Sequence, residues 1–378
     1  MCSYATGQKV CRPLCPPVPS YFTEEIGGGV AYVSMDDAIA EATPPPPAPC
    51  ATAETSYEAV LLNAMAQYAN YTTEEKLQRP RMSVVLRPDG RRSRFILLDG
   101  APYMCRAVSY SPVPIGEDPS YHEPFGDYFT DNYGGIWRRD LALFKEMGAN
   151  TVRLYAWRLK SRHNQFLDEA DRLGLTVMSV FEMGTAEDTP VGTPAERQIF
   201  YARVANRLRI SRHRAITAWF IGNELNGAWN AYVCEKDYEE KFLHFPGGCT
   251  FKDNATRLCE LIDDACAVVQ AEGKLCTTPW AGVGTPGKYN WQIGPQFGWD
   301  QDWGWQNWMK VCEGTRGPSG GRSWEKFNGG EEYEGVEHID FWSANLYPGK
   351  DFASSGNFKM YEVASDMPLL VSEYGIDA

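Results

Sequence analysis

The amino-acid sequence predicts an α/β fold, a (β/α)8 TIM barrel that stops after its seventh strand. From about residue 94 onward, short apolar runs alternate with segments of helical spacing, a pattern typical of βα units around a parallel sheet. Several of the apolar runs are bounded by glycine, as expected for buried parallel strands. The length of 378 residues accommodates one barrel-sized domain with an extension.

The first half of the predicted barrel follows a hairpin strand at residues 95–100. Two segments have helical spacing, and each stops at a glycine, Gly148 or Gly174, which is a common residue just after a helix. The expected helices lie at 136–147 and 166–173, and the expected strands at 103–110, 151–155 and 175–181.

The second half begins at Thr193-Pro194-Ala195-Glu196, which has capping-box spacing with proline at the first helical position. The next helix is expected at 256–271. The strands of this half are expected at 216–222, 275–280, 338–346 and 368–372. Because this gives seven strands, the last unit of a closed barrel is missing. We therefore expect a fragment or an incomplete gene model, with exposed sheet edges and poor stability.

Residues 1–92 differ in composition from the rest of the chain. They contain the run Pro44-Pro45-Pro46-Pro47 and four cysteines, without a periodic apolar pattern except for one helix expected at 54–67. We predict a leader that is poorly ordered or forms a small accessory segment. The barrel domain is expected at residues 93–378.

Composition argues against several kinds of partner. The net charge of −13 disfavours nucleic acid and anionic membrane surfaces, and no apolar stretch is long enough for a membrane span. The five histidines have no ligand spacing, and no glycine motif for phosphate stands between a strand and a helix. No cofactor and no metal site are therefore expected.

The cysteines favour an oxidising compartment. Eleven are present, although the N-terminus lacks the apolar segment of a signal peptide. We therefore expect a secreted or cell-surface protein whose start is missing or misassigned. Cys234 and Cys249 bracket a long loop and are candidates for a disulfide. Cys259 and Cys266 lie too far apart on one helix to bridge each other, so we expect them to be small buried hydrophobic residues.

Two apolar strands end in glutamate, and they carry the functional prediction. Glu224 follows Trp219-Phe220-Ile221-Gly222-Asn223, and Glu373 follows Leu370-Val371-Ser372. Barrel enzymes place their chemistry at the carboxyl ends of the strands, and two carboxylates are the minimum for cleaving a glycosidic bond. We predict Glu224 and Glu373 as catalytic residues, with Asn223 hydrogen-bonding a substrate hydroxyl.

Three further polar residues are predicted at the same end of the barrel. Arg153, near the end of the second strand, is expected to keep Glu373 ionised, since a nearby cation lowers the pKa of a carboxylate. Tyr347 is expected to donate a hydrogen bond to the same carboxylate, which would separate the roles of the two glutamates. Tyr110 is a candidate for binding substrate, with a core role as the alternative.

An aromatic-rich segment follows the predicted strand at 275–280. It includes the candidate substrate-binding residues Trp280, Trp291 and Trp303. Its position after a strand puts it on the active-site face of a barrel, where aromatic rings stack on sugars. The alternative, that these rings form the small core of a large loop, stays open.

The motifs around these residues resemble, in order, the clan A retaining glycoside hydrolases. They are Asn150-Thr151-Val152-Arg153-Leu154-Tyr155, Gly222-Asn223-Glu224, Asn345-Leu346-Tyr347 and Ser372-Glu373-Tyr374-Gly375. Within the clan, the stretch from Ala107-Val108-Ser109-Tyr110 through Arg139-Asp140-Leu141 to Arg153-Leu154-Tyr155-Ala156 is most similar to glycoside hydrolase family 72, the β-1,3-glucanosyltransferases. Family 2 is a close competitor, because Ser372-Glu373-Tyr374-Gly375-Ile376-Asp377 suits its nucleophile strand equally well.

The resemblance covers about residues 93–378. It implies a retaining mechanism on an oligo- or polysaccharide of β-linked glucan, with Glu224 as acid/base and Glu373 as nucleophile. Hydrolysis and sugar transfer both remain open. The alternatives are a family 2-like exo-β-glycosidase and a non-catalytic carbohydrate-binding protein on a decayed barrel.

Overall fold

The structure, a computed structural model, contains two compact units, residues 1–56 and 57–378. In the first, β1 (Cys2–Ala5) and β2 (Gln8–Cys11) form an antiparallel hairpin. The second unit starts before the boundary predicted at residues 92 and 93, and includes α2 (Tyr57–Ala69). The structure describes residues 2–5, 8–11, 57–70, 72, 81–86, 92–119, 121–158, 160–183, 194–225, 251–282, 305–314, 333–347, 358, 361 and 365–375.

Five parallel strands form the first sheet of the second unit, in the order β10-β9-β8-β7-β6. Their order along the chain matches their order in the sheet, so each βα unit adds one strand beside the last, as in a barrel. The strands are β6 (Ala107–Tyr110), β7 (Thr151–Leu154), β8 (Thr176–Phe181), β9 (Ile216–Ile221) and β10 (Leu275–Thr277).

The strand predicted at 275–280 is in fact two short strands that belong to different sheets. β11 (Pro279–Ala281) follows β10 directly but pairs with β12 (Trp342–Leu346), which pairs with β13 (Leu369–Tyr374), all in parallel. Pro279 at the break has no N–H to donate to a ladder. Together the two sheets give the described part of the chain seven consecutive parallel strand positions, a partial (β/α)8 barrel.

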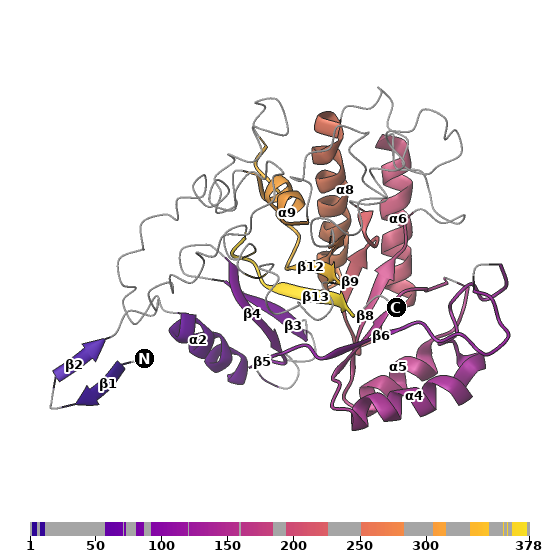
Figure 1. The fold of residues 1–378 in the computed structure, drawn as a ribbon, viewed down its shortest axis with the longest axis horizontal. Coiled ribbons are helices and arrows are strands. Elements are labelled where there is room, and N and C mark those ends of the chain that lie inside the picture. Colours follow the sequence, from indigo (N-terminus) through magenta and orange to yellow (C-terminus); the bar gives the residue numbers. More distant parts are fainter. Residues whose placement is uncertain are drawn as a thin grey trace, which may run out of the picture. The chain divides into compact units, whose positions relative to one another are not determined.

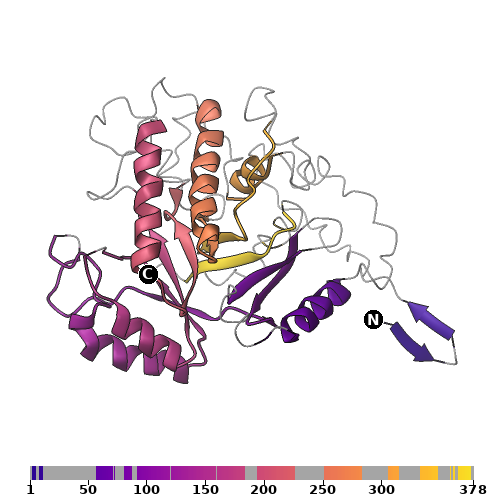
Figure 2. The same ribbon diagram turned by 180° about the vertical axis from the view of Figure 1, so that it is seen from behind.

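Helices cover the outside of these strands. Figures 1 and 2 show α6 (Pro194–Ile210) beside α8 (Phe251–Ala271), and α4 (Gly134–Glu146) beside α5 (Asn164–Arg172). In α6, one face is buried, through Phe200, Val204 and Leu208 at four-residue spacing, as expected for a helix on a sheet. The short helix α9 (Trp305–Glu313) was not predicted.

A small antiparallel sheet fills the amino-terminal end of the barrel. It consists of β3 (Met82–Leu86), β4 (Arg92–Leu98) and β5 (Ala101–Pro102). Its apolar side chains pack against inward-facing barrel residues, including Val180, Phe220 and Phe341. Just after it, the Tyr103 hydroxyl donates to Asn150 O at 3.0 Å, at the start of β7. The opposite end of the barrel is therefore the open one among the described elements.

Two disulfides fasten α8 to its neighbours. Cys259 bonds to Cys312 of α9, and Cys266 bonds to Cys276 of β10. The prediction that Cys259 and Cys266 are unbridged was wrong, because the two residues contact different neighbours of the helix instead of each other. Cys234 and Cys249 lie outside the described residues.

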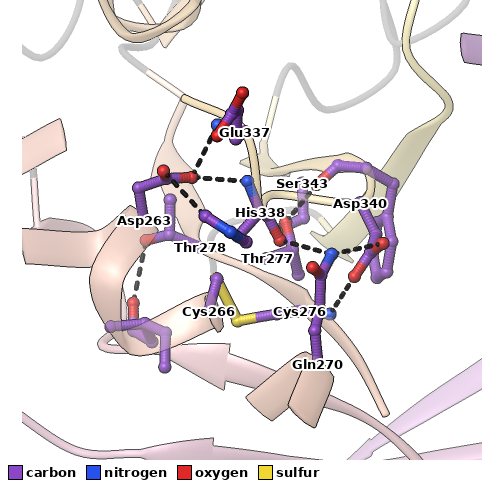
Figure 3. The surroundings of a disulfide bond; sticks show 12 residues. Asp263, Cys266, Gln270, Cys276, Thr277, Thr278, Glu337, His338, Asp340 and Ser343 are labelled. Carbon is purple, nitrogen blue, oxygen red and sulfur yellow. Dashed lines mark hydrogen bonds and ion pairs between the residues drawn. A yellow bond between two sulfur atoms is a disulfide. The ribbon is translucent and has the colours of Figure 1, made fainter. Parts of the chain in front are cut away.

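Hydrogen bonds reinforce the attachment of α8 beside the second disulfide (Figure 3). The Asp263 carboxylate accepts the backbone N–H of His338 at 2.7 Å, and Gln270 donates to Asp340 at 2.8 Å. The other Asp340 oxygen accepts the backbone N–H of Cys276. Residues His338 and Asp340 are therefore bonded to α8 and β10 before the strand begins. The strand predicted at 338–346 starts only at Trp342.

No helix within the described ranges combines the length and the apolar character needed to cross a lipid bilayer.

Candidate active site

The end of β9 holds Glu224 in an unusual backbone conformation. Gly222 and Glu224 both have positive φ angles, 66° and 54°, in the left-handed region that non-glycine residues seldom adopt. A Cβ at residue 222 would lie 2.6 Å from Leu225 Cδ2, so both the angle and the space require glycine there. The Glu224 N–H donates to Pro279 O at 2.8 Å, which ties this turn to β11.

Glu373 lies on β13 and is surrounded by donors. The Arg153 guanidinium donates from Nη1 to Glu373 Oε1 at 2.6 Å, and the Tyr347 hydroxyl donates to Glu373 Oε2. The Glu373 side chain is 15% exposed, whereas that of Arg153 is 2% exposed. Both oxygens of the Glu373 carboxylate are therefore held in place by hydrogen bonds, one of them from a buried cation.

Arg153 connects both glutamate strands. Its Nη2 donates to Asn223 Oδ1 at 2.6 Å, while Nη1 also donates to Ser372 O at 3.0 Å. The guanidinium lies over the rings of Tyr155 and Phe220, 4.5 and 4.9 Å from their centroids. The planar fork of arginine suits this pattern of several fixed acceptors.

Asn345, on β12, contacts both glutamates. Its Nδ2 donates to Glu224 Oε1 and to Glu373 Oε1, each at 2.9 Å. The two carboxylate oxygens therefore lie no more than twice this distance apart. Asn345 was not predicted as a site residue, although it stands two positions before Tyr347 in the motif Asn345-Leu346-Tyr347.

Burial shifts the proton affinities of the site. It raises the pKa of Glu224, and the nearby Glu373 carboxylate adds to the rise, while the hydrogen bond from Asn345 and the charge of Arg153 oppose it. Burial and the bond to Glu373 raise the pKa of Tyr347, and burial raises the pKa of Tyr155 to about 12. Both tyrosines therefore remain hydroxyl donors near neutral pH.

Five of the predicted site residues meet at one end of the barrel: Arg153, Asn223, Glu224, Tyr347 and Glu373. The predicted substrate-binding residues Tyr110 and Trp280 lie elsewhere. Tyr110 points outward, with its ring against Phe144 and its hydroxyl donating to Asp140 Oδ2 at 2.8 Å. The preceding residue of β6, Ser109, accepts a bond from Tyr155. Since strand side chains alternate, Tyr110 belongs to the core beneath the helices.

Trp280 is also a core residue. It is fully buried and stacks on Trp308 of α9, with 5.3 Å between ring centroids. Trp291 and Trp303 lie outside the described residues. Among the described residues, Tyr347 and Tyr374 are exposed aromatic residues close to the carboxyl ends of β12 and β13, with 37% and 72% of their surface exposed.

Within the described ranges, no group of three or more His, Cys, Asp or Glu side chains is arranged to hold a metal ion. The donors around the two carboxylates are amide, guanidinium and hydroxyl groups. Such a set can transfer protons and stabilise charge, which is general acid–base chemistry.

No protein-family model and no curated protein matches the chain. Among solved structures, it is similar to Gas2 of Saccharomyces cerevisiae in complex with laminaripentaose, with 14% identity and a TM-score of 0.46 over 80% of this chain and 55% of that chain. A Glu-to-Gln mutant with laminaritetraose and laminaripentaose gives 13% identity, a TM-score of 0.48 and coverages of 80% and 54%. A third structure, Gas2 with another ligand, has 14% identity and a TM-score of 0.49, and the match covers 80% of this chain and 56% of that chain.

The chain therefore spans little more than half the length of these Gas2 structures.

Proposed function

We propose that the protein is a retaining glycoside hydrolase or transglycosylase that acts on a β-linked glucan. The observation that carries this proposal is the contact of Asn345 Nδ2 with both carboxylates at 2.9 Å. It limits the separation of the two oxygens to under about 6 Å. Retaining enzymes need roughly 5–5.5 Å, whereas inverting enzymes need about 6.5–9.5 Å to admit a water molecule.

The surroundings of the two carboxylates support different roles for them. Glu373 accepts hydrogen bonds from Arg153 and Tyr347, which orient its carboxylate to act as the nucleophile. Glu224 has a pKa raised mainly by burial, so it is suited to carry a proton.

The reaction would proceed by double displacement. Glu373 attacks the anomeric carbon while Glu224 gives its proton to the leaving oxygen, which yields a glycosyl–enzyme ester and an ionised Glu224. Glu224 then removes a proton from the attacking hydroxyl, which releases Glu373. Water as the attacking group gives hydrolysis, and a sugar hydroxyl gives transfer.

The substrate class rests on the motif resemblance to family 72. The partly exposed ring of Tyr347, whose hydroxyl donates to Glu373, suits contact with a sugar face. The two disulfides support a secreted or cell-surface location, because such bonds persist in oxidising compartments.

The test is activity on laminari-oligosaccharides, with product sizes read by mass spectrometry. Longer and shorter products together indicate transfer, and only shorter products indicate hydrolysis and favour the family 2-like alternative. Glu373→Ala should abolish both. Glu272→Gln is the matched control, since this glutamate pairs with Arg212 before the start of β10, away from the site.

Chemical rescue assigns the two roles. With azide and an activated aryl β-glucoside, Glu224→Ala should give the β-glucosyl azide, because the nucleophile is intact. Glu373→Ala should give the α-glucosyl azide, because azide replaces the nucleophile itself. If the wild-type protein leaves β-1,3-glucan and a panel of other β-glycosides untouched, yet binds them, the non-catalytic alternative holds.

A further inference from the structure

The side-chain amide of Asn345 is fully buried and bonded on both sides. Its Oδ1 accepts from Ser372 Oγ at 2.7 Å and from Arg153 Nη1 at 3.2 Å. Its Nδ2 faces the oxygens of Glu224 and Glu373 at 2.9 Å. An amide nitrogen carries two hydrogens, and the two carboxylates lie closer to it than its third acceptor, Asn223 Oδ1 at 3.3 Å.

The partners allow only one orientation of this amide. Turned by 180°, its oxygen would face the two carboxylates, and its NH₂ group would face the guanidinium of Arg153, which has no lone pair to offer. In the observed orientation every contact joins a donor to an acceptor. The direction of the amide is therefore fixed by Arg153 and Ser372, before substrate is present.

The hydrogen bonds of the Asn345 amide are buried. Asn345, Arg153 and Ser372 are 0%, 1% and 6% exposed, so water does not compete for these bonds. An unmet polar group here would be costly. A rigid donor set of this kind holds reacting groups without reorganisation during the reaction.

We propose that Asn345 is a positioning residue for both catalytic glutamates, which holds the nucleophile and the acid/base at the separation that double displacement requires. The inference rests on the proposed function and extends it. Asn345 acts through the glutamates, because its own polar atoms are taken up by the protein. Its donor to Glu224 also favours the ionised form that this residue takes in the second half of the cycle.

Three proteins test this proposal: the wild type, Asn345→Ala and the matched control Ser343→Ala. Ser343 lies two residues earlier on the same face of β12, is equally buried and contacts Thr277. The pH profile of kcat/KM is measured for each. In parallel, the Glu224 carboxyl is titrated by ¹³C NMR and assigned with Glu224→Gln.

We expect Asn345→Ala to lower kcat/KM by about 10²–10³-fold, as for loss of a preorganised donor. The alkaline limb of its profile and the titration of Glu224 should both move to higher pH, since the ionised form loses a hydrogen bond. Ser343→Ala should match the wild type in both. The proposal would be overturned if a folded Asn345→Ala variant kept both the alkaline limb of the kcat/KM profile and the Glu224 titration at their wild-type pH.

The titration separates this inference from the proposed function, because it needs no turnover. An inactive wild type whose Glu224 titration moves on substitution would refute the enzyme assignment alone. If Asn345→Ala fails to fold, Ser372→Ala replaces it, since it removes one of the two donors that orient Asn345. That variant should shift the titration in the same direction by a smaller amount, and no shift would overturn the proposal.

Discussion

The two disulfides of α8 are expected to stabilise the protein by different amounts. Each bond restricts the unfolded chain, and the restriction grows with the number of residues that the bond encloses. The sequence separations are 53 residues for Cys259–Cys312 and 10 residues for Cys266–Cys276. The chain-entropy relation then gives about 4 kcal/mol for the first bond and about 2.7 kcal/mol for the second.

The two double variants that remove one disulfide each can be compared directly. All four cysteines are fully buried, so Cys259→Ala/Cys312→Ala and Cys266→Ala/Cys276→Ala remove the same number of sulfur atoms from the core. The loss from packing should therefore nearly cancel. The remaining difference is about 1.5 kcal/mol, from the ratio of the enclosed lengths alone.

Guanidinium unfolding, followed by circular dichroism under identical buffer conditions, measures this difference. The first double variant should have the lower midpoint at an unchanged m value. Equal midpoints, or a lower midpoint for Cys266→Ala/Cys276→Ala, would refute the loop-length reasoning. A wild-type midpoint that does not change on reduction would show that neither bond forms in solution.

Three further predictions concern the site. Because the pKa of Glu224 is raised in the folded state, its contribution to stability is complete below about pH 4 and is lost as pH rises through the folded pKa. Glu224→Gln should thus melt at the wild-type temperature at low pH but above it at pH 7, and a lower melting temperature at pH 7 would contradict this. Arg153→Met leaves Glu373 without its cation and should cost about 3–5 kcal/mol of unfolding free energy, whereas a loss below about 1 kcal/mol in the same guanidinium assay would contradict a buried pair. Tyr347→Phe should lower kcat about 10²-fold with little change in melting temperature, because the ring is partly exposed, and unchanged turnover on laminari-oligosaccharides would exclude its donation to Glu373.

The sequence predicts the positions of the strands and of the two glutamates well, for a physical reason. Buried parallel strands are nearly continuous apolar runs, so a glutamate at the end of such a run lies at or near the end of a strand. Glu224 and Glu373 stand out in this way. Arg153 stands out too, because a charge within an apolar strand requires a partner.

The direction of a side chain at the end of a strand is harder to predict. Tyr110 and Ser109 differ by one position, and only the packing against Phe144 and Asp140 decides which of them faces outward. A shift of one residue reverses the assignment. For the same reason Trp280, at the break between two short strands, belongs to the core with Trp308.

Contacts between distant segments account for the other differences. The partners of Cys259 and Cys266 lie on α9 and β10, and helical spacing alone does not identify them. The role of Asn345 likewise depends on two glutamates that come from different strands. Its polar side chain inside an apolar strand was the available signal.

The small sheet at the amino-terminal end of the barrel has a consequence for synthesis of the chain. Met82 emerges from the ribosome early, whereas Phe341, in the same interior cluster, follows after more than half of the chain. Until then, the apolar side chains of β3 and β4 lack part of their packing. Contacts between such distant segments form slowly, and exposed strands are prone to aggregate meanwhile. Folding of this protein in the cell should therefore depend on chaperones until the late segment around Phe341 has been synthesised.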